Sequence, residues 1–266
     1  MEHSLQIRHI IAGVAAALVI IGAIMWTLYP RAVAAPIAEV ASTTGALATT
    51  STNGVTGTGA FTVSKDDAIE LPTPPDFRAP IAYATSVAPD VRAIIETKAQ
   101  KLQTQLAKDS FDLGAWIDLG AVRKMAGDYR GAETAWAFVA KAAPQNTIAF
   151  ANLADLYMNF LKDYPKAEVM LKKVIALDPA QVEPYVSLAT LYENFYKTGT
   201  AAAEDILKKG VQLHPSSVDL RVLLARLYAQ AGRTTEAQAQ YQAAIDSAQK
   251  QGHADTASQL KAEAGL

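Results

Sequence analysis

A unit of about 35 residues recurs four times between residues 113 and 251, and this recurrence constrains the fold more than any other feature of the chain. Each unit contains an alanine that is followed, four residues later, by a large side chain. The alanines are 35, 36 and 34 residues apart, and the four pairs are Ala132–Trp136, Ala167–Leu171, Ala203–Leu207 and Ala237–Tyr241. Self-similarity at such a period indicates a stack of similar supersecondary units, each covering its neighbour.

Other slots recur in phase with the alanine. An opening residue is followed three residues later by a leucine and a small residue, as in Trp116, Leu119 and Gly120 of the first unit. The later units contain Phe150, Leu153 and Ala154, then Tyr185, Leu188 and Ala189, then Arg221, Leu224 and Ala225. A tyrosine recurs later in the second, third and fourth units, as Tyr157, Tyr192 and Tyr228. A proline closes the first, second and third units, as Pro144, Pro179 and Pro215. Small residues let two helices approach closely, and a proline ends a helix.

This pattern resembles the tetratricopeptide repeat (TPR) family, whose consensus places W-x2-L-G-x2-Y, A-x3-F and P within about 34 residues. The resemblance implies an all-α fold, a TPR-type solenoid of helical hairpins in which each hairpin buries its apolar face against the next. About four repeats are expected, at residues 113–146, 147–181, 182–217 and 218–251. The sequence departs from the consensus where Arg123 replaces the tyrosine of the first repeat and Arg221 the opening aromatic of the fourth.

Two flanking helices complete the expected repeat domain, residues 89–266. Pro89 and Asp90 begin a segment with apolar residues at helical spacing, and these are Val91, Ile94, Ile95, Ala99, Leu102 and Leu106. In the repeat register it resembles the second helix of a degenerate repeat. Residues 255–263 form a short polar segment after Gly252, which predicts a helix that caps the far end of the array.

Residues 10–29 contain no charged side chain, and a helix of this length spans about 30 Å, the thickness of a bilayer's hydrocarbon core. After an N-terminal tail (residues 1–9), this run predicts a single-pass transmembrane helix. The alternative is a signal peptide cleaved after Ala34, although its apolar region is usually shorter. Both interpretations imply export. We expect an anchor in the cell membrane of a bacterial envelope, with the N-terminus cytoplasmic and the repeats extracytoplasmic.

Residues 30–88 are rich in Thr, Ala, Gly and Pro and predict a flexible linker, because such a segment cannot bury enough apolar area to offset its ordering entropy. Residues 81–83 form a short apolar stretch within it. Whether this stretch docks on a partner, on the repeat domain or on nothing stays open at this point.

Neither a catalytic motif nor a metal-ligand spacing is found. The chain has no cysteine and four histidines, none paired at ligand spacing, and it lacks the G-x-S-x-G and P-loop patterns. Its net charge is −2, and between Asp90 and Leu266 the 20 basic and 20 acidic residues balance. Lys172–Lys173 and Lys208–Lys209 are interpreted as solvated faces. We therefore expect no enzyme activity, no metal, no small-molecule cofactor and no nucleic-acid partner.

The resemblance implies that the first helix of each repeat lines a concave groove that accepts an extended peptide or a helix. The groove slots carry over to Lys124, Met125, Asp155, Met158, Asn159, Thr190, Asn194, Arg226 and Gln230. The alternative is that these are ordinary exposed positions without a ligand. Some family members grip a carboxylate with a clamp of Lys, Arg and Asn. Here only Asn152 matches, because the other slots hold Ile117, Ala121, Glu183 and Ser187.

The expected function is that of a membrane-anchored scaffold or adaptor that binds a protein or peptide partner. The alternative is an assembly factor or chaperone for exported proteins, similar to those of cytochrome maturation. The two differ in whether the partner forms a stable complex or is captured transiently.

Overall fold

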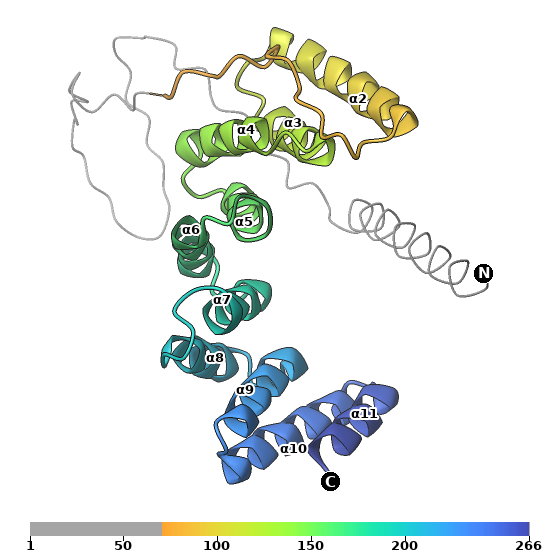
Figure 1. The fold of residues 1–266 in the computed structure, drawn as a ribbon. Coiled ribbons are helices and arrows are strands. Elements are labelled where there is room, and N and C mark those ends of the chain that lie inside the picture. The colour runs from red at the N-terminus through yellow and green to blue at the C-terminus, as the bar shows by residue number, and fades with distance from the viewer. Residues whose placement is uncertain (1–70, 266) are drawn as a thin grey trace, which may run out of the picture. The chain divides into compact units, whose positions relative to one another are not determined.

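The computed structural model describes residues 71–265, and in this part of the chain every regular element is helical (Figure 1). The α-helices are α2 (Pro89–Lys108), α3 (Leu113–Ala126), α4 (Tyr129–Ala142), α5 (Thr147–Asp155), α6 (Tyr164–Leu177), α7 (Glu183–Asn194), α8 (Ala202–Leu213), α9 (Val218–Gln230), α10 (Thr234–Lys250) and α11 (Ala254–Ala264). A π-helical segment, η2 (Leu156–Leu161), continues α5. The predicted membrane segment, residues 10–29, lies outside the described residues. Between residues 71 and 265, none of the helices has the length and apolar character needed to cross a membrane.

The helices pair as consecutive hairpins, which confirms the all-α hairpin architecture predicted from the repeat. The hairpins are α3–α4, α5 with η2 and α6, α7–α8, and α9–α10, and each packs against the next. Figure 1 shows α5 and α7 on one side of the array and α6 and α8 on the other. Helix α2 packs on α3, and α11 packs on α10.

Local sequence explains where several helices begin. The side chains of Asp112, Asp128, Asn146, Asp163 and Ser217 each accept a hydrogen bond from a backbone N–H in the first turn of the helix that follows. Each such cap contributes about 1 kcal/mol to helix stability. Four of these residues, Asp112, Asp128, Asn146 and Ser217, directly follow a turn after the preceding helix. Each helix therefore begins within a few residues of the end of the one before it.

Close helix packing requires the small residue that the repeat pattern contains. A Cβ atom added to Gly120 on α3 would lie only 2.3 Å from Nε1 of Trp136 on α4. Trp136 is 2% exposed, and its Nε1 donates a hydrogen bond of 3.0 Å to the carbonyl of Ile117. The indole therefore fills the space that Gly120 leaves, and any larger residue there would push the two helices apart.

Between the tyrosine slot and the repeat alanine, the second repeat contains one residue more and the third repeat two residues more than the first. Such insertions are expected to lengthen the turn between the two helices. The third repeat confirms this, with a longer connection from Asn194 to Ala202, but for the second repeat the prediction is wrong. Residues 156–161 instead form η2, and the N–H of Asp163 bonds the carbonyl of Tyr157. A π turn absorbs one additional residue without breaking the helix, so the turn itself keeps the length it has in the first repeat.

Residues 77–87 lie against the first hairpin, and we call them the strap. The strap was predicted to belong to a flexible linker that extends to residue 88, and the structure corrects this prediction. Phe77 meets the Trp116 ring edge-on at 6.4 Å, and the N–H of Ala84 donates a 2.8 Å hydrogen bond to the carbonyl of Ala126. Ile81, Tyr83 and Val87 pack against the core formed by α2, α3 and α4. Of the possibilities left open for residues 81–83, docking on the domain itself is the one found.

Helix α2 buries only part of its predicted apolar face. Ile95, Ala99, Leu102 and Leu106 are buried, whereas Val91 is 37% and Ile94 53% exposed. These two residues lie at the start of the helix, where no first helix of a preceding repeat covers them among the described residues.

Candidate functional site

The outward side chains of α3, α5, α7 and α9 define a surface that we call the first-helix face. The Nζ atom of Lys124 on α3 donates to Oδ2 of Asp155 on α5, and Oδ1 of Asp155 accepts a 2.7 Å bond from Asn159. These contacts show that the outward sides of α3 and α5 are adjacent. Farther along, Arg226 of α9 makes a bidentate pair with Glu263 of α11, with distances of 2.7 and 2.9 Å.

The predicted groove residues lie on this face with unequal accessibility. Lys124, Asp155 and Asn159 form one polar cluster, and Met125 beside them is 51% exposed. The remaining predicted residues are spread over α7 and α9, with Thr190 half-buried and Asn194, Arg226 and Gln230 exposed. Arg226 is engaged by Glu263, so its guanidinium is already paired. The structure therefore groups three of the predicted polar residues and separates the others by one or two repeats.

Met158 does not belong to the accessible surface, which corrects its place among the predicted groove residues. Its side chain is 9% exposed and packs in the core. It lies within η2, where bonding from residue i to i+5 breaks the α-helical register that the prediction assumed.

Sequence reasoning missed two exposed apolar residues on the same face. Ile148, in the first turn of α5, is 58% exposed, and Phe160 is 37% exposed. The Phe160 ring lies 4.8 Å from the Tyr129 ring and 4.7 Å from Nζ of Lys124. The signal for Ile148 was present, because it precedes Asp155 by seven residues and so shares its side of the helix. No periodic signal marked Phe160, which is exposed at the end of the π segment.

A second recurring arrangement links each repeat to the next through the tyrosine slot. The hydroxyls of Tyr157, Tyr192 and Tyr228 donate to Glu133, Glu168 and Glu204, which are the residues that follow the repeat alanines. Each pair is separated by 24 residues. The acceptor carboxylates also bind cations, such as Lys197 with Glu168 and Arg233 with Glu204. The tyrosines of the repeat pattern therefore act as hydrogen-bond bridges between neighbouring hairpins.

Glu168 is the most buried of these carboxylates. Burial alone would raise its pKa, but hydrogen bonds from Lys172, Lys197 and Tyr192 outweigh burial and lower the pKa of Glu168 to about 2. Burial and the same carboxylate raise the pKa of the Tyr192 hydroxyl. The group is thus a permanently ionised acceptor at neutral pH and has no proton to exchange with a substrate.

The contacts of Arg123 explain why the first repeat has an arginine where the other repeats have a tyrosine. Its guanidinium is buried and donates to Oδ2 of Asp128 at 2.6 Å and to the carbonyls of Ala79 and Pro80 at 2.5 and 3.4 Å. A tyrosine at this position could not satisfy three acceptors on two segments. The arginine of the first repeat therefore binds the strap, whereas the tyrosine at the same position of the other repeats binds the preceding hairpin.

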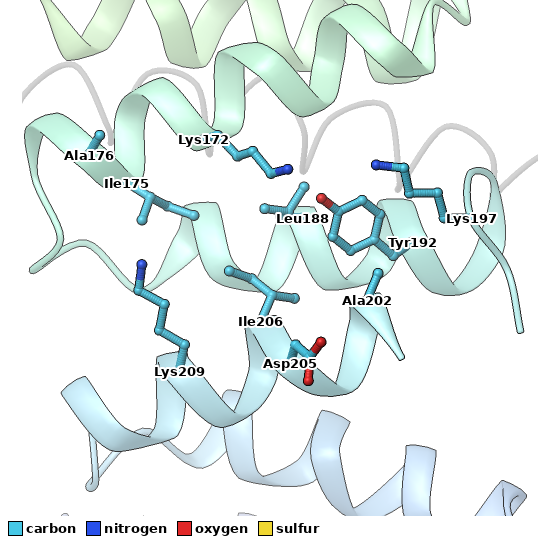
Figure 2. A pocket seen from close by; sticks show the side chains of 10 residues that line it. All are labelled: Lys172, Ile175, Ala176, Leu188, Tyr192, Lys197, Ala202, Asp205, Ile206 and Lys209. Carbon is cyan, nitrogen blue, oxygen red and sulfur yellow. The ribbon is translucent and has the colours of Figure 1, made fainter. Parts of the chain in front are cut away.

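A cleft of about 510 Å³ opens on the other side of the array, between α6, α7 and α8 (Figure 2). Its floor is apolar, and three lysines stand around its rim. Among residues 71–265, no group of three or more His, Cys, Asp or Glu side chains could hold a metal ion.

Comparison with known proteins agrees with this geometry. The sequence model of the tetratricopeptide repeat family matches residues 200–262, from just before α8 into α11. The chain folds as a TPR solenoid. A crystal structure of MamA superposes with a TM-score of 0.51 at 15% identity, covering 61% of this chain and 94% of that chain. At this identity the likeness concerns the fold alone.

Other solved structures are similar at lower scores. A second MamA structure is 25% identical, with a TM-score of 0.44, and covers 57% of this chain and 89% of that chain. YrrB, described as a TPR protein with an unusual peptide-binding site, is 14% identical, with a TM-score of 0.45, and covers 61% and 90% of the two chains. No curated protein sequence matches the chain significantly. TPR arrays in general present extended surfaces for binding other proteins.

Proposed function

We propose that this protein is a membrane-anchored adaptor whose TPR solenoid binds a peptide or protein segment on the first-helix face. The observation that carries the proposal is the exposure of two large apolar side chains on adjacent first helices, Met125 at 51% and Ile148 at 58%. The small exposed residues Ala121 and Ala151 lie one turn from them, so a ligand's side chains could reach the helices. Accessible apolar area bordered by polar groups is typical of protein-binding surfaces.

The polar cluster of Lys124, Asp155 and Asn159 borders this apolar area and supplies hydrogen-bonding groups for a peptide backbone or a polar side chain. Because Lys124 and Asp155 neutralise each other, this part of the face has no strong preference for a charged ligand. The carboxylate clamp expected of some family members has no counterpart here, since Ile117 and Ala121 occupy two of its slots. The ligand is therefore expected to be recognised through apolar side chains.

The membrane part of the proposal depends on residues 10–29, whose uncharged run is long enough to span a bilayer. The linker after it would hold the repeats away from the bilayer surface, on the extracytoplasmic side. Extraction of membranes at alkaline pH provides the test. The full chain should stay in the membrane pellet and a variant lacking residues 1–34 should be released. Release of the full chain would refute the anchor.

Site-specific photo-crosslinking tests the binding surface. A photoreactive phenylalanine analogue at Met125 or Ile148 of the full chain, in cells that express it, should crosslink to the same protein. The matched control is the same analogue at Ile94, which is 53% exposed but lies on α2, outside the four repeats. Crosslinks no stronger than those of the Ile94 variant would contradict the proposal.

The same experiment separates the adaptor from the assembly-factor alternative. Met125 supports that alternative, because a flexible methionine adapts to varied apolar partners. A scaffold should yield one dominant crosslinked protein that persists after protein synthesis is stopped. A chaperone-like factor should yield many exported proteins, and these should disappear when synthesis stops.

A further inference from the structure

The cleft on the second-helix side has properties that the first-helix face does not explain. Helices α6, α7 and α8 form it, with Lys172, Lys197 and Lys209 on the rim. Leu188 and Ile175 are buried at its base, and the accessible apolar lining comes from Ile206, Ala202 and Ala176. Figure 2 shows the ammonium groups of Lys172 and Lys197 near the Tyr192 hydroxyl, and that of Lys209 near Ile175 at the opposite end. A volume of about 510 Å³ is within the range of ligand-binding clefts.

At one end of the cleft, two positive charges share a single carboxylate. Nζ of Lys172 lies 2.5 Å from Oε1 of Glu168, and Nζ of Lys197 lies 2.8 Å from both carboxylate oxygens. The Tyr192 hydroxyl donates to the same Oε1 atom at 2.6 Å. Glu168 is thus fully occupied as an acceptor and neutralises only one of the two ammonium groups. Within residues 71–265, neither ammonium group pairs with a second carboxylate.

At the other end, Lys209 makes no ion pair with any of the described residues. Asp205 precedes it by one helical turn, and Glu168 is the other carboxylate nearby, so three rim lysines face two carboxylates. Lys208 of α8 is paired with Glu204, and Nζ of Lys173 lies 5.7 Å from the centre of the Phe150 ring, so the positive excess at the cleft comes from its three rim lysines. The charge balance of the repeat domain as a whole therefore conceals a local positive excess around an apolar floor.

We propose that this cleft is a second binding site and that it takes a peptide segment in which acidic residues flank apolar ones. The apolar residues would cover Ile206, Ala202 and Ala176, and the acidic residues would meet the two basic ends. A carboxylate near Lys172 and Lys197 would receive charge-assisted hydrogen bonds from donors that Glu168 does not use. A single small anion would satisfy one end only, whereas a segment of chain satisfies both and covers the floor between them.

This site is independent of the proposed binding site on α3 and α5, because its residues come from α6, α8 and the inward side of α7. A protein that used both surfaces would join two partners, or two segments of one partner, at neighbouring repeats. The interpretation of Lys172 and Lys209 as ordinary solvated residues is the alternative, and the experiment must separate the two.

Selection from a random 12-residue peptide library displayed on phage, with the full chain in mild detergent as bait, is the test. Peptides retained by the wild-type chain are then tested for binding to the Lys209→Glu and Lys172→Met variants, and those that either variant binds less well are kept. The second substitution removes the excess charge but leaves Lys197 and Tyr192 on Glu168, so no buried group loses all its partners. Lys141→Glu on α4 is the matched control, and thermal unfolding of each variant checks folding.

The expected result is a group of peptides with Asp or Glu on both sides of apolar residues, each bound about fivefold more weakly by either cleft variant and unchanged by Lys141→Glu. Replacing Asp and Glu by Asn and Gln in these peptides should have the same effect. The proposal is overturned if no peptide depends on Lys209 or Lys172, or if the dependent peptides lack acidic residues. It is also overturned if vesicles of anionic phospholipid bind the wild-type chain but not Lys209→Glu while no peptide is selected.

Discussion

The hydrogen-bonded carboxylate of Glu168 makes the stability of the array depend on pH in a defined window. We consider the substitution Glu168→Gln, which keeps the shape of the side chain and removes its charge. Glu168 is 7% exposed and accepts bonds from Tyr192, Lys172 and Lys197. Because the amide would accept these bonds more weakly and place an NH2 group against one of the three donors, the variant should be less stable at neutral pH.

The magnitude follows from the depressed pKa. Folding lowers the pKa of Glu168 from 4.5 to about 2, and each pKa unit corresponds to about 1.4 kcal/mol of differential stabilisation of the charged form. The full shift would give about 3 kcal/mol. The side chains of Lys172 and Lys197 are 58% and 40% exposed, so solvent screens part of this interaction. We expect Glu168→Gln to lower the free energy of unfolding by about 2 kcal/mol at pH 7.

The sign of the pH dependence is fixed by the direction of the shift. A carboxyl group whose pKa is depressed on folding stabilises the folded state above its unfolded pKa, and this contribution disappears as pH falls toward the folded pKa. The difference between wild type and Glu168→Gln should therefore be constant above about pH 5.5 and shrink between pH 4.5 and about 2. The glutamine variant does not titrate, so it provides the reference.

Urea unfolding of the full chain, followed by circular dichroism at several pH values from 7 to 3, measures this difference. Glu183→Gln is the control, because Glu183 is exposed and, among residues 71–265, its carboxylate is hydrogen-bonded only by the Ser187 hydroxyl. The control should behave like wild type at every pH. A difference between wild type and Glu168→Gln that stays the same from pH 7 to pH 3, or an equal effect of Glu183→Gln, would refute the reasoning.

Three further predictions concern backbone and packing. Lys162 adopts a left-handed conformation with φ of 55°, so Lys162→Gly should raise the free energy of unfolding by up to about 1 kcal/mol in urea titrations, and a loss of stability would contradict the strain argument. Gly120→Ala should lower it by about 2 kcal/mol, because the new methyl group would overlap Trp136, whereas Gly114→Ala at the exposed start of α3 should change it little. Arg123→Tyr, which restores the family's usual residue, should free the strap; limited proteolysis should then cut the strap faster than in wild type, and an unchanged rate would show that the arginine does not hold it.

The hairpin architecture was predictable because its determinants are local and repeated. A short turn between α3 and α4 brings the small residue Gly120 against the large residue Trp136. The sequence spacing of such small and large residues therefore indicates which helices pair. The caps are also local, since an aspartate such as Asp128 bonds a backbone N–H three residues later. Four repetitions of one pattern strengthened each assignment.

The predicted ligand residues were less reliable, because exposure depends on helix register and on neighbouring elements. Met158 was assigned to the accessible face by α-helical spacing, and the π segment buries it. Arg226 is exposed as a groove residue would be, but Glu263 of the capping helix occupies its guanidinium. Such pairings join residues 37 positions apart, and no spacing rule within one repeat predicts them.

By itself, the sequence determined the hairpins and their order, because each depends on contacts between residues a few positions apart or at corresponding places in adjacent repeats. It also established the balance of charge over the repeat domain. The tertiary structure decided the rest. Arg123 binds the strap over more than 40 positions of chain, and stacking α6, α7 and α8 gathers three lysines around one apolar floor. Charges that balance along the chain separate in space because side chains from different helices meet only when the hairpins pack.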